Sequence, residues 1–151
     1  MRHQKHNHTL GVKKEHREAL LANLTTALLT HDRIETTLAK ARALRPFAEK
    51  VITLAKKAYT VEAPEQKLHF RRLALARVRD ESVVKSLFDE KVESFLKRNG
   101  GYTRIYKLVP RYSDASKMAI IELVAADDTG HKKPRRRGAK KAKAPAEEAV
   151  A

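Results

Sequence analysis

The sequence of 151 residues contains no cysteine and no tryptophan, and only 5% of its residues are aromatic. Without cysteine the chain cannot form disulfides, zinc knuckles or a thiol nucleophile, and this composition is compatible with a reducing compartment such as the cytoplasm. It also lacks an apolar run of about 20 residues and a signal peptide, which argues against membrane insertion and secretion. Aliphatic side chains must therefore form most of the core of a soluble domain.

The motifs of common catalytic sites are missing as well. No P-loop, G-x-S-x-G elbow, dinucleotide-binding glycine pattern or paired zinc motif occurs in the sequence. Neighbouring carboxylates lie beside basic residues or near the C-terminus, where we expect them to be solvated rather than bound to metal. These pairs are Asp80 with Glu81, Asp89 with Glu90, Asp127 with Asp128, and Glu147 with Glu148. We therefore expect no enzyme activity, no cofactor and no small-molecule substrate.

Histidines near the N-terminus are the remaining candidates for metal ligands. His3, His6 and His8 approach the spacing of such ligands, but no cysteine and no acidic residue precedes Glu15 to complete a site. A partly protonated histidine donates hydrogen bonds to phosphates and to 2′-hydroxyl groups. We interpret these histidines as RNA contacts and expect no bound metal.

Positive charge is what the sequence has in excess. Lysine and arginine total 33 against 18 aspartate and glutamate, which gives a formal net charge of +15. Such a surface favours a polyanionic partner, because basic side chains neutralise phosphates and release condensed counterions. The surplus is spread over the whole chain, with five basic residues against one acidic in 1–17, twenty against thirteen in 18–126 and eight against four in 127–151. A basic core flanked by basic extensions is typical of nucleic-acid binding, although composition does not separate RNA from DNA.

The chain divides into three parts by its apolar pattern. Residues 1–14 show no apolar period and form a basic arm, and residues 15–125 form a single α+β RNA-binding domain. Residues 126–151 have one large apolar residue, Val150, and are too poor in hydrophobic side chains to offset the entropy of ordering. We expect this basic tail to be disordered.

Apolar residues at three- and four-residue steps predict a first helix over residues 15–31. A second helix follows Thr36 and Thr37, whose hydroxyls can accept hydrogen bonds from its first free amides. Its apolar stripe continues past Pro46, where we expect a kink or a restart of the helix near Arg45.

A third helix begins near Pro64, because proline suits the first helical turn. Its expected apolar seam consists of Leu68, Leu75, Ala76 and Val78. Four arginines occupy much of its remaining surface and can make forked contacts to phosphates, although a solvated face is the alternative. They are Arg71, Arg72, Arg77 and Arg79.

A fourth helix is predicted from Ser82, a hydroxyl cap, to Arg98, where Asn99, Gly100 and Gly101 stop it. The two glycines allow a sugar–phosphate chain to approach the backbone closely. The stretch NGGYTR adds Tyr102 as a stacking ring and Arg104 as a guanidinium, although a simple helix stop that leads into a strand is compatible with the same residues.

Short strands are expected at residues 33–37, 102–109 and 118–124. The last two, joined by the turn region 110–117, predict an antiparallel hairpin. The expected fold is therefore α+β, with about four helices packed on a small mixed three-stranded sheet.

Several segments together resemble the bacterial ribosomal protein L17 family. They are MRH at the start, HREALLANLTTALLTHDRIETTLAKARALR, VITLAKKA, LALARVRD and GGYTRIYKL. The order and spacing of these segments match from Met1 to about Val124. The resemblance implies an α+β protein that binds large-subunit (23S) ribosomal RNA beside neighbouring ribosomal proteins, without cofactor or catalysis.

Family positions imply specific RNA contacts. The residues that match the family's basic arm are Arg2, His3, Lys5, His16 and Arg17. The family's I-x-T-T-x-x-K turn is matched by Thr36, Thr37 and Lys40. Its GGYTR segment is matched by Gly100, Gly101, Tyr102, Thr103 and Arg104. Further basic candidates are His8, Lys13, Lys14, Arg42 and Arg98. The sequence departs from the family at Gln4 and at Gly11 with Val12, where Lys13 and Lys14 lie close enough to substitute.

The predicted function is that of a structural constituent of the large ribosomal subunit, located in the cytoplasm, whose core docks on folded RNA while the arm becomes ordered. The alternative is a DNA-binding, chromosome-compacting protein, for which the tail rich in Lys and Ala is the best argument. An RNA-processing enzyme is a further alternative, and it would depend on a carboxylate or a histidine for turnover. No membrane partner is expected.

Overall fold

The computed structural model describes residues 8–124. Its elements are α1 (Lys14–His31), β1 (Arg33–Thr37), α2 (Leu38–Thr60), α3 (Pro64–Val78), α4 (Glu81–Asp89), the short 3-10 helix η1 (Lys91–Phe95), β2 (Thr103–Lys107) and β3 (Met118–Leu123). The predictions for Arg2, His3, Lys5 and the tail at 126–151 lie outside the described residues. The α+β fold class is confirmed.

The sheet is built around β3, in the order β1-β3-β2. Ile34 of β1 and Ile105 of β2 both lie opposite Ile121 of β3. Both pairings are antiparallel, so the prediction of a mixed sheet was wrong. Just after α1, the carbonyl of Asp32 accepts a hydrogen bond from the amide of Leu123 (2.8 Å), the last residue of β3. Strand β1 therefore starts beside the C-terminal end of β3 and runs antiparallel to it.

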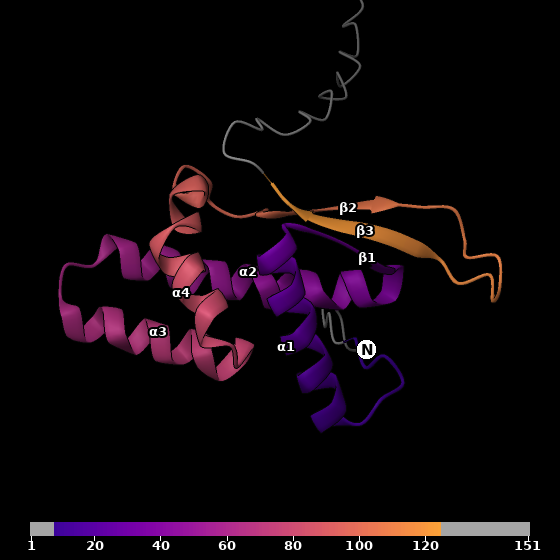
Figure 1. Ribbon diagram of the computed structural model, residues 1–151, viewed down its shortest axis with the longest axis horizontal. Helices are drawn as coiled ribbons and strands as arrows, with labels where there is room; N and C mark the ends of the chain where they lie inside the picture. Colours follow the sequence, from indigo (N-terminus) through magenta and orange to yellow (C-terminus); the bar gives the residue numbers. More distant parts are fainter. Residues whose placement is uncertain (1–7, 125–151) are drawn as a thin grey trace, which may run out of the picture.

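Helix α2 carries one apolar stripe that serves two core clusters. Its N-terminal half packs against the sheet and α1, where Ala41, Leu44 and Ala48 meet Leu28 and Ile121. Its C-terminal half contributes to a second cluster with α3, α4 and η1. Figure 1 shows α2 crossing the molecule, with α3 beside its C-terminal half and the sheet over its N-terminal half.

Pro46 lies inside α2, and the helix neither ends nor restarts there. The residues buried on its two sides, Leu44 and Ala48, are both fully buried and belong to the same cluster. Packing of one stripe across the proline therefore holds the helix together, which offsets the hydrogen bond that proline removes.

Two predicted helix caps are wrong. Thr37 precedes α2 but its hydroxyl accepts no cap hydrogen bond. The first amide of α2, that of Leu38, instead donates to the carbonyl of Lys117 (2.8 Å) from the hairpin beside it. Helix α4 begins two residues earlier than a Ser82 cap requires, because the carboxylate of Asp80 accepts from the amides of Ser82 and Val83.

The fourth helix is also shorter than predicted. Helix α4 ends at Asp89, and η1 continues the chain as a separate 3-10 segment. The predicted apolar side chains still reach the core, since Val84, Leu87, Val92 and Phe95 are buried. The periodicity was therefore informative about burial but not about the break in the helix.

Helix α3 has an orientation that its sequence did not indicate. Ala74 and Val78 are its buried residues, whereas Leu68 and Leu75 of the predicted seam are exposed. The helix does begin at Pro64, as predicted.

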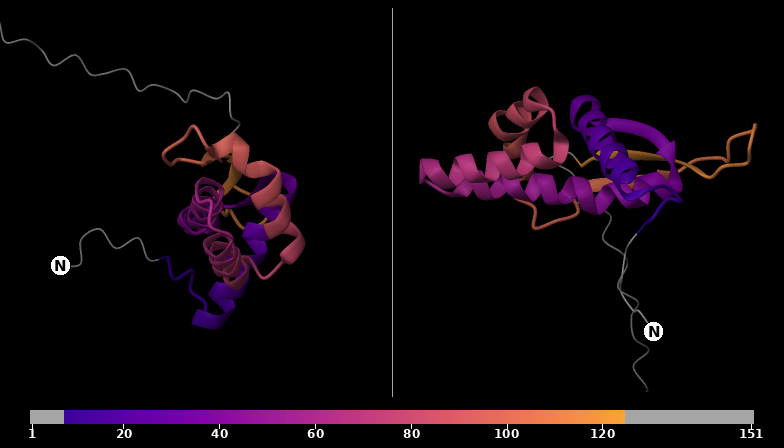
Figure 2. Two further views of the ribbon diagram at one scale, coloured as in Figure 1. Left: turned by 90° about the vertical axis from the view of Figure 1, so that its left-hand side faces the viewer. Right: turned by 90° about the horizontal axis from the view of Figure 1, so that it is seen from below.

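The β2–β3 loop, residues 108–117, extends beyond the body of the molecule (Figure 2). The guanidinium of Arg111 donates two hydrogen bonds to the carboxylate of Asp114, at 3.0 and 2.8 Å, and Ser116 donates to it from its amide and its hydroxyl. The hydrogen bonds from Arg111 and Ser116 hold the pKa of Asp114 well below its ordinary value. The salt bridge between Arg111 and Asp114 therefore closes the loop.

Titration of Asp114 tests this loop. A carboxyl whose pKa is lowered by folding stabilises the closed loop above its unfolded pKa, near 3.9, and loses that effect only as the pH falls through the lower folded value. NMR titration of the carboxyl should give a midpoint below about 3.9, and Arg111→Ala should raise it. A midpoint at the ordinary value in the unchanged chain would contradict the closed loop.

The stripe of α2 can be tested by a cavity substitution. Leu44→Ala removes a fully buried side chain and should lower the free energy of unfolding by about 2–5 kcal/mol. Leu73→Ala is the matched control, because Leu73 is exposed and its loss should change that free energy by roughly 0.5 kcal/mol. Urea unfolding of both variants measures the difference, and equal effects would show that the stripe does not organise the core.

Candidate nucleic-acid interface

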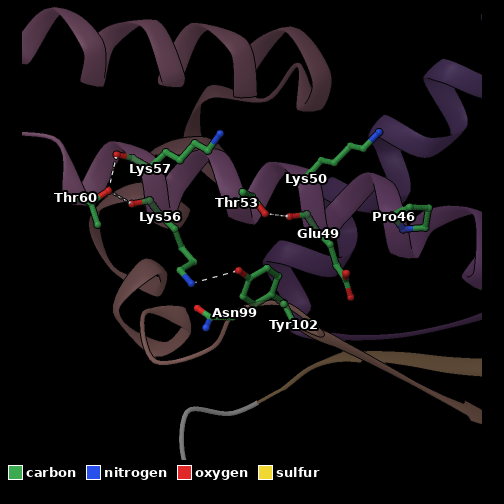
Figure 3. Close-up of a pocket in the computed structure, with 10 residues that line it drawn as sticks. Pro46, Glu49, Lys50, Thr53, Lys56, Lys57, Thr60, Asn99 and Tyr102 are labelled. Atoms are coloured by element: carbon green, nitrogen blue, oxygen red, sulfur yellow. Dashed lines mark hydrogen bonds between the residues drawn. The ribbon is translucent and has the colours of Figure 1, made fainter.

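The polar face of α2 borders a hollow with several basic side chains, which we call the α2 groove. It has a volume of about 600 Å³ and lies between α2 and the turn at residues 98–101 (Figure 3). It is lined by Pro46, Glu49, Lys50, Thr53, Lys56, Lys57, Thr60, Asn99, Gly100 and Tyr102. Its lining includes three lysines and one carboxylate, and that carboxylate is engaged, since Glu49 accepts a hydrogen bond from Thr103 (3.0 Å) and lies 3.6 Å from Arg45.

Lys56 anchors the turn at 98–101 onto α2. Its ammonium donates to the carbonyl of Arg98 and to the hydroxyl of Tyr102 (3.3 Å), and it lies 5.3 Å from the centre of the Tyr102 ring. The ring packs edge-on against Phe95, with 5.6 Å between centroids. One lysine of the groove is thus committed to holding the turn in place.

Tyr102 was expected to stack on bases, and the structure places it in the core instead. Its side chain is only 4% exposed, between Lys56 and Phe95. Thr103 is buried too, because its hydroxyl donates to Glu49 of α2. Both residues fix the start of β2 against the helix, so they position the turn rather than offer a face to a ligand.

Gly100 lines the groove, and Gly101 follows it in the same turn. Their φ angles are +131° and +64°, which L side chains rarely adopt. No atom lies within 4 Å of the place that a Cβ would occupy at either glycine. The glycines therefore satisfy the backbone turn and leave free space through which a chain can approach the peptide groups.

Lys50 and Lys57 were not predicted, yet both are exposed and line the groove. They lie seven residues apart on the face of α2 opposite its apolar stripe, so their positions differ by about 10 Å along the helix axis. Both lysines could have been predicted from the sequence, because the apolar stripe of a helix identifies the opposite face as polar.

A second hollow, of about 370 Å³, continues from the first, because both include Pro46 and Glu49. It is lined also by His8, Arg42 and Arg45. The end of the N-terminal arm thus lies beside α2, and the two hollows meet at Pro46 and Glu49 of that helix.

The remaining arm and turn candidates do not line either hollow. Lys13, Lys14 and His16 are exposed at the start of α1, and Arg17 donates to the carbonyl of Thr9 (3.5 Å). Thr36, Thr37 and Lys40 are half-buried where β1 meets α2. The structure brings His8 and Arg42 together, as the sequence did not foresee.

Other candidates are scattered. Arg98 is half-buried in the turn, and Arg104 donates to the hydroxyl of Tyr106 (3.3 Å) on β2. The four arginines of α3 are exposed, and none of them lines the α2 groove. Arg71 is paired with Asp89 and lies 5.6 Å from the Phe88 ring.

Among residues 8–124, no group of three or more His, Asp or Glu side chains is placed to hold a metal ion. None of the helices in this part of the chain is long and apolar enough to cross a membrane. The candidate site is therefore defined by its basic side chains and by the glycine turn.

Comparison with known proteins gives a consistent result. A family model described as Ribosomal protein L17 matches residues 20–124. The large ribosomal subunit protein bL17 of Opitutus terrae is 58% identical over 142 residues, which cover 93% of this chain and 83% of that protein. The proteins of the same name from Methylacidiphilum infernorum and Zymomonas mobilis are 51% and 50% identical, over 81% and 85% of this chain and 87% and 86% of their own lengths.

The structural role of Tyr102 can be tested without RNA. Tyr102→Ala should lower the free energy of unfolding by about 3–5 kcal/mol, as expected for loss of a buried aromatic ring. Tyr112→Ala is the matched control, because Tyr112 is fully exposed in the β2–β3 loop, and it should cost roughly 0.5 kcal/mol or less. Thermal unfolding of the free protein measures both. If the Tyr102 variant were as stable as the unchanged chain, the ring would not support the core, and it would again be a candidate RNA contact.

Proposed function

Since the chain belongs to the ribosomal protein L17 family, we propose that it is a structural constituent of the bacterial large ribosomal subunit that binds and stabilises folded 23S ribosomal RNA and catalyses no reaction. The observation that carries this proposal is the α2 groove, where lysines and an open glycine turn border one hollow. Its place of action is the ribosome in the bacterial cytoplasm.

The α2 groove suits the sugar–phosphate backbone of RNA. Lys50 and Lys57 are free to neutralise phosphates, since Lys56 holds the turn and Glu49 is engaged with Thr103. The ammonium group of lysine acts as a mobile point charge, which suits phosphates at irregular positions. The exposed backbone at Gly100 allows the RNA strand to approach closely.

The second hollow extends the contact toward the arm. His8 and Arg42 line it together, and Lys13, Lys14 and His16 continue the basic surface at the start of α1. Arg2, His3, Lys5 and Arg17 complete the proposed arm contacts. The turn residues Thr36, Thr37 and Lys40, together with Arg77, Arg79, Arg98 and Arg104, are proposed as further contacts outside the two hollows.

Ribosomal RNA is a better partner for this surface than duplex DNA. The relatives are named as proteins of the large ribosomal subunit, and the α2 groove is a local hollow rather than a helix presented to a DNA groove. Folded RNA offers phosphates at irregular spacing, which a hollow between a helix and a turn can accept. Ribosomal proteins from the same subunit are the proposed neighbours.

Salt dependence of binding tests the groove. For single-stranded or duplex targets, the logarithm of affinity falls by roughly 0.7–0.9 per phosphate neutralised for each tenfold rise in salt. The double variant Lys50→Ala with Lys57→Ala should therefore bind large-subunit RNA with a salt slope smaller by roughly 1.4–1.8. Filter binding over a salt series measures the slope.

Lys67→Ala is the control for this experiment, because Lys67 is exposed on α3 and does not line the α2 groove. It should leave the slope close to that of the unchanged chain. A double variant with the same slope as the control would exclude Lys50 and Lys57 from the RNA contact.

A further inference from the structure

Helix α3 presents three leucines to the outside. Leu68, Leu73 and Leu75 are 48%, 41% and 37% exposed, whereas Ala74 is fully buried. Ala74 belongs to the same core cluster as Ala55 and Ala58 of α2. Phe70 and Val78 lie four residues before and after Ala74, on the same face of α3, and both pack in this cluster, so the three leucines lie off the buried face. The leucines are thus left outside by the packing of α2 against α3.

Two of these leucines lie in a hollow between α3 and α4, which we call the α3–α4 groove. It has a volume of about 240 Å³ and is lined by Leu68, Arg71, Arg72, Leu75, Glu81, Val84 and Lys85. Leu68, Arg72 and Leu75 follow one another at four- and three-residue steps, so they share one face of the helix. The groove therefore combines an apolar floor with basic side chains.

The walls of this groove are held in place. Two residues, Arg79 and Asp80, connect α3 to α4. Arg79 closes α3 in the left-handed conformation, with its amide donating to the carbonyl of Leu75 (2.8 Å), and Asp80 caps α4. Arg71 spans the two helices, since it is paired with Asp89 and lies on the ring of Phe88. The groove is thus preformed, which lowers the entropic cost of binding.

The charges of the groove favour an acidic occupant. Arg71, Arg72 and Lys85 outnumber its one carboxylate, Glu81. Arg71 already has Asp89 as its partner, but neither Arg72 nor Lys85 forms an ion pair with another residue in the described range 8–124. Both are therefore available to carboxylates or to phosphates.

The exposed leucines favour a ligand with carboxylates, a protein, over a ligand with phosphates. Exposed leucine side chains gain stability by burial against apolar atoms, which phosphates do not supply. The α2 groove differs in this respect, because lysines, threonines, Asn99 and Gly100 account for most of its lining and no leucine takes part. An apolar floor with arginine at its edge is typical of protein interfaces, where such residues form the anchoring contacts.

We propose that the α3–α4 groove docks an acidic protein segment of a neighbouring large-subunit protein, with an apolar side chain of that segment seated against Leu68 and Leu75. Arg72 and Lys85 pair with carboxylates beside the apolar anchor. This inference rests on the proposed function, and it assigns Arg71 and Arg72 to a protein partner in place of the RNA contacts expected from the sequence. The protein then contacts RNA through α2 and a protein through α3.

Site-specific crosslinking in assembled subunits tests this assignment. A diazirine-bearing amino acid is placed at Leu75 in the full chain, large subunits that contain it are purified, and the crosslinked partner is identified by mass spectrometry. The expected product joins residue 75 to a ribosomal protein peptide that contains an apolar residue next to Asp or Glu. A crosslink to ribosomal RNA, to a peptide without a carboxylate, or to nothing in intact subunits would overturn the proposal.

The same crosslinker at Lys57 provides the matched control. It should yield ribosomal RNA, because Lys57 lines the α2 groove. If the chain enters subunits and residue 57 reaches RNA while residue 75 reaches no acidic peptide, the docking proposal fails and the proposed function stands. If the chain does not enter subunits, both fail.

A charge reversal separates a specific contact from mere proximity. Arg72→Glu should reduce the protein crosslink from residue 75 by at least about fivefold, since it places a carboxylate against carboxylates. It should leave the RNA crosslink from residue 57 unchanged. Lys67→Glu is the control, because Lys67 is exposed on α3 and lines neither the α3–α4 groove nor the α2 groove, and it should leave both crosslinks unchanged. Loss of the RNA crosslink in the Arg72 variant would identify α3 as an RNA contact.

Discussion

The packing of the apolar stripe of α2 is the interaction on which the rest of the structure depends. Both core clusters include residues of this helix: Leu44 lies in the cluster with the sheet, and Ile52 lies in the cluster with α3, α4 and η1. Neither cluster could keep its place relative to the other without a continuous helix through both. This requirement explains why α2 continues through Pro46. Burial of the stripe also turns the opposite, polar face of α2 outward.

The same helix fixes the surfaces that we assign to function. Lys56 and Glu49 reach from α2 to Tyr102 and Thr103 and hold the start of β2, so the glycine turn borders the same groove as the exposed lysines. On its other flank, α2 packs in one core cluster with Phe70, Ala74 and Val78 of α3, which leaves the leucines of α3 outside. One helix thus separates a cationic groove suited to RNA from an apolar, basic groove suited to protein.

Much of this fold could be predicted from the sequence, because local patterns determined it. The strand at 33–37, the start of α3 at Pro64 and the hairpin depended on β-branched residues, proline and glycine, whose preferences are local. The outward leucines of α3 could not be predicted, since periodicity identifies the faces of a helix but not which face its neighbour will admit. Tyr102 was misassigned for a similar reason: GGYTR showed a turn, whereas the partner of the ring, Lys56, lies 46 residues away.

A cryo-electron-microscopy map of the large ribosomal subunit containing this chain is the most direct test of the central claim that α2 presents an RNA-binding groove. The account predicts 23S ribosomal RNA backbone in the α2 groove, with phosphates beside Lys50 and Lys57 and a strand passing over Gly100. A groove that faces solvent, or that is filled by another protein, would contradict the account.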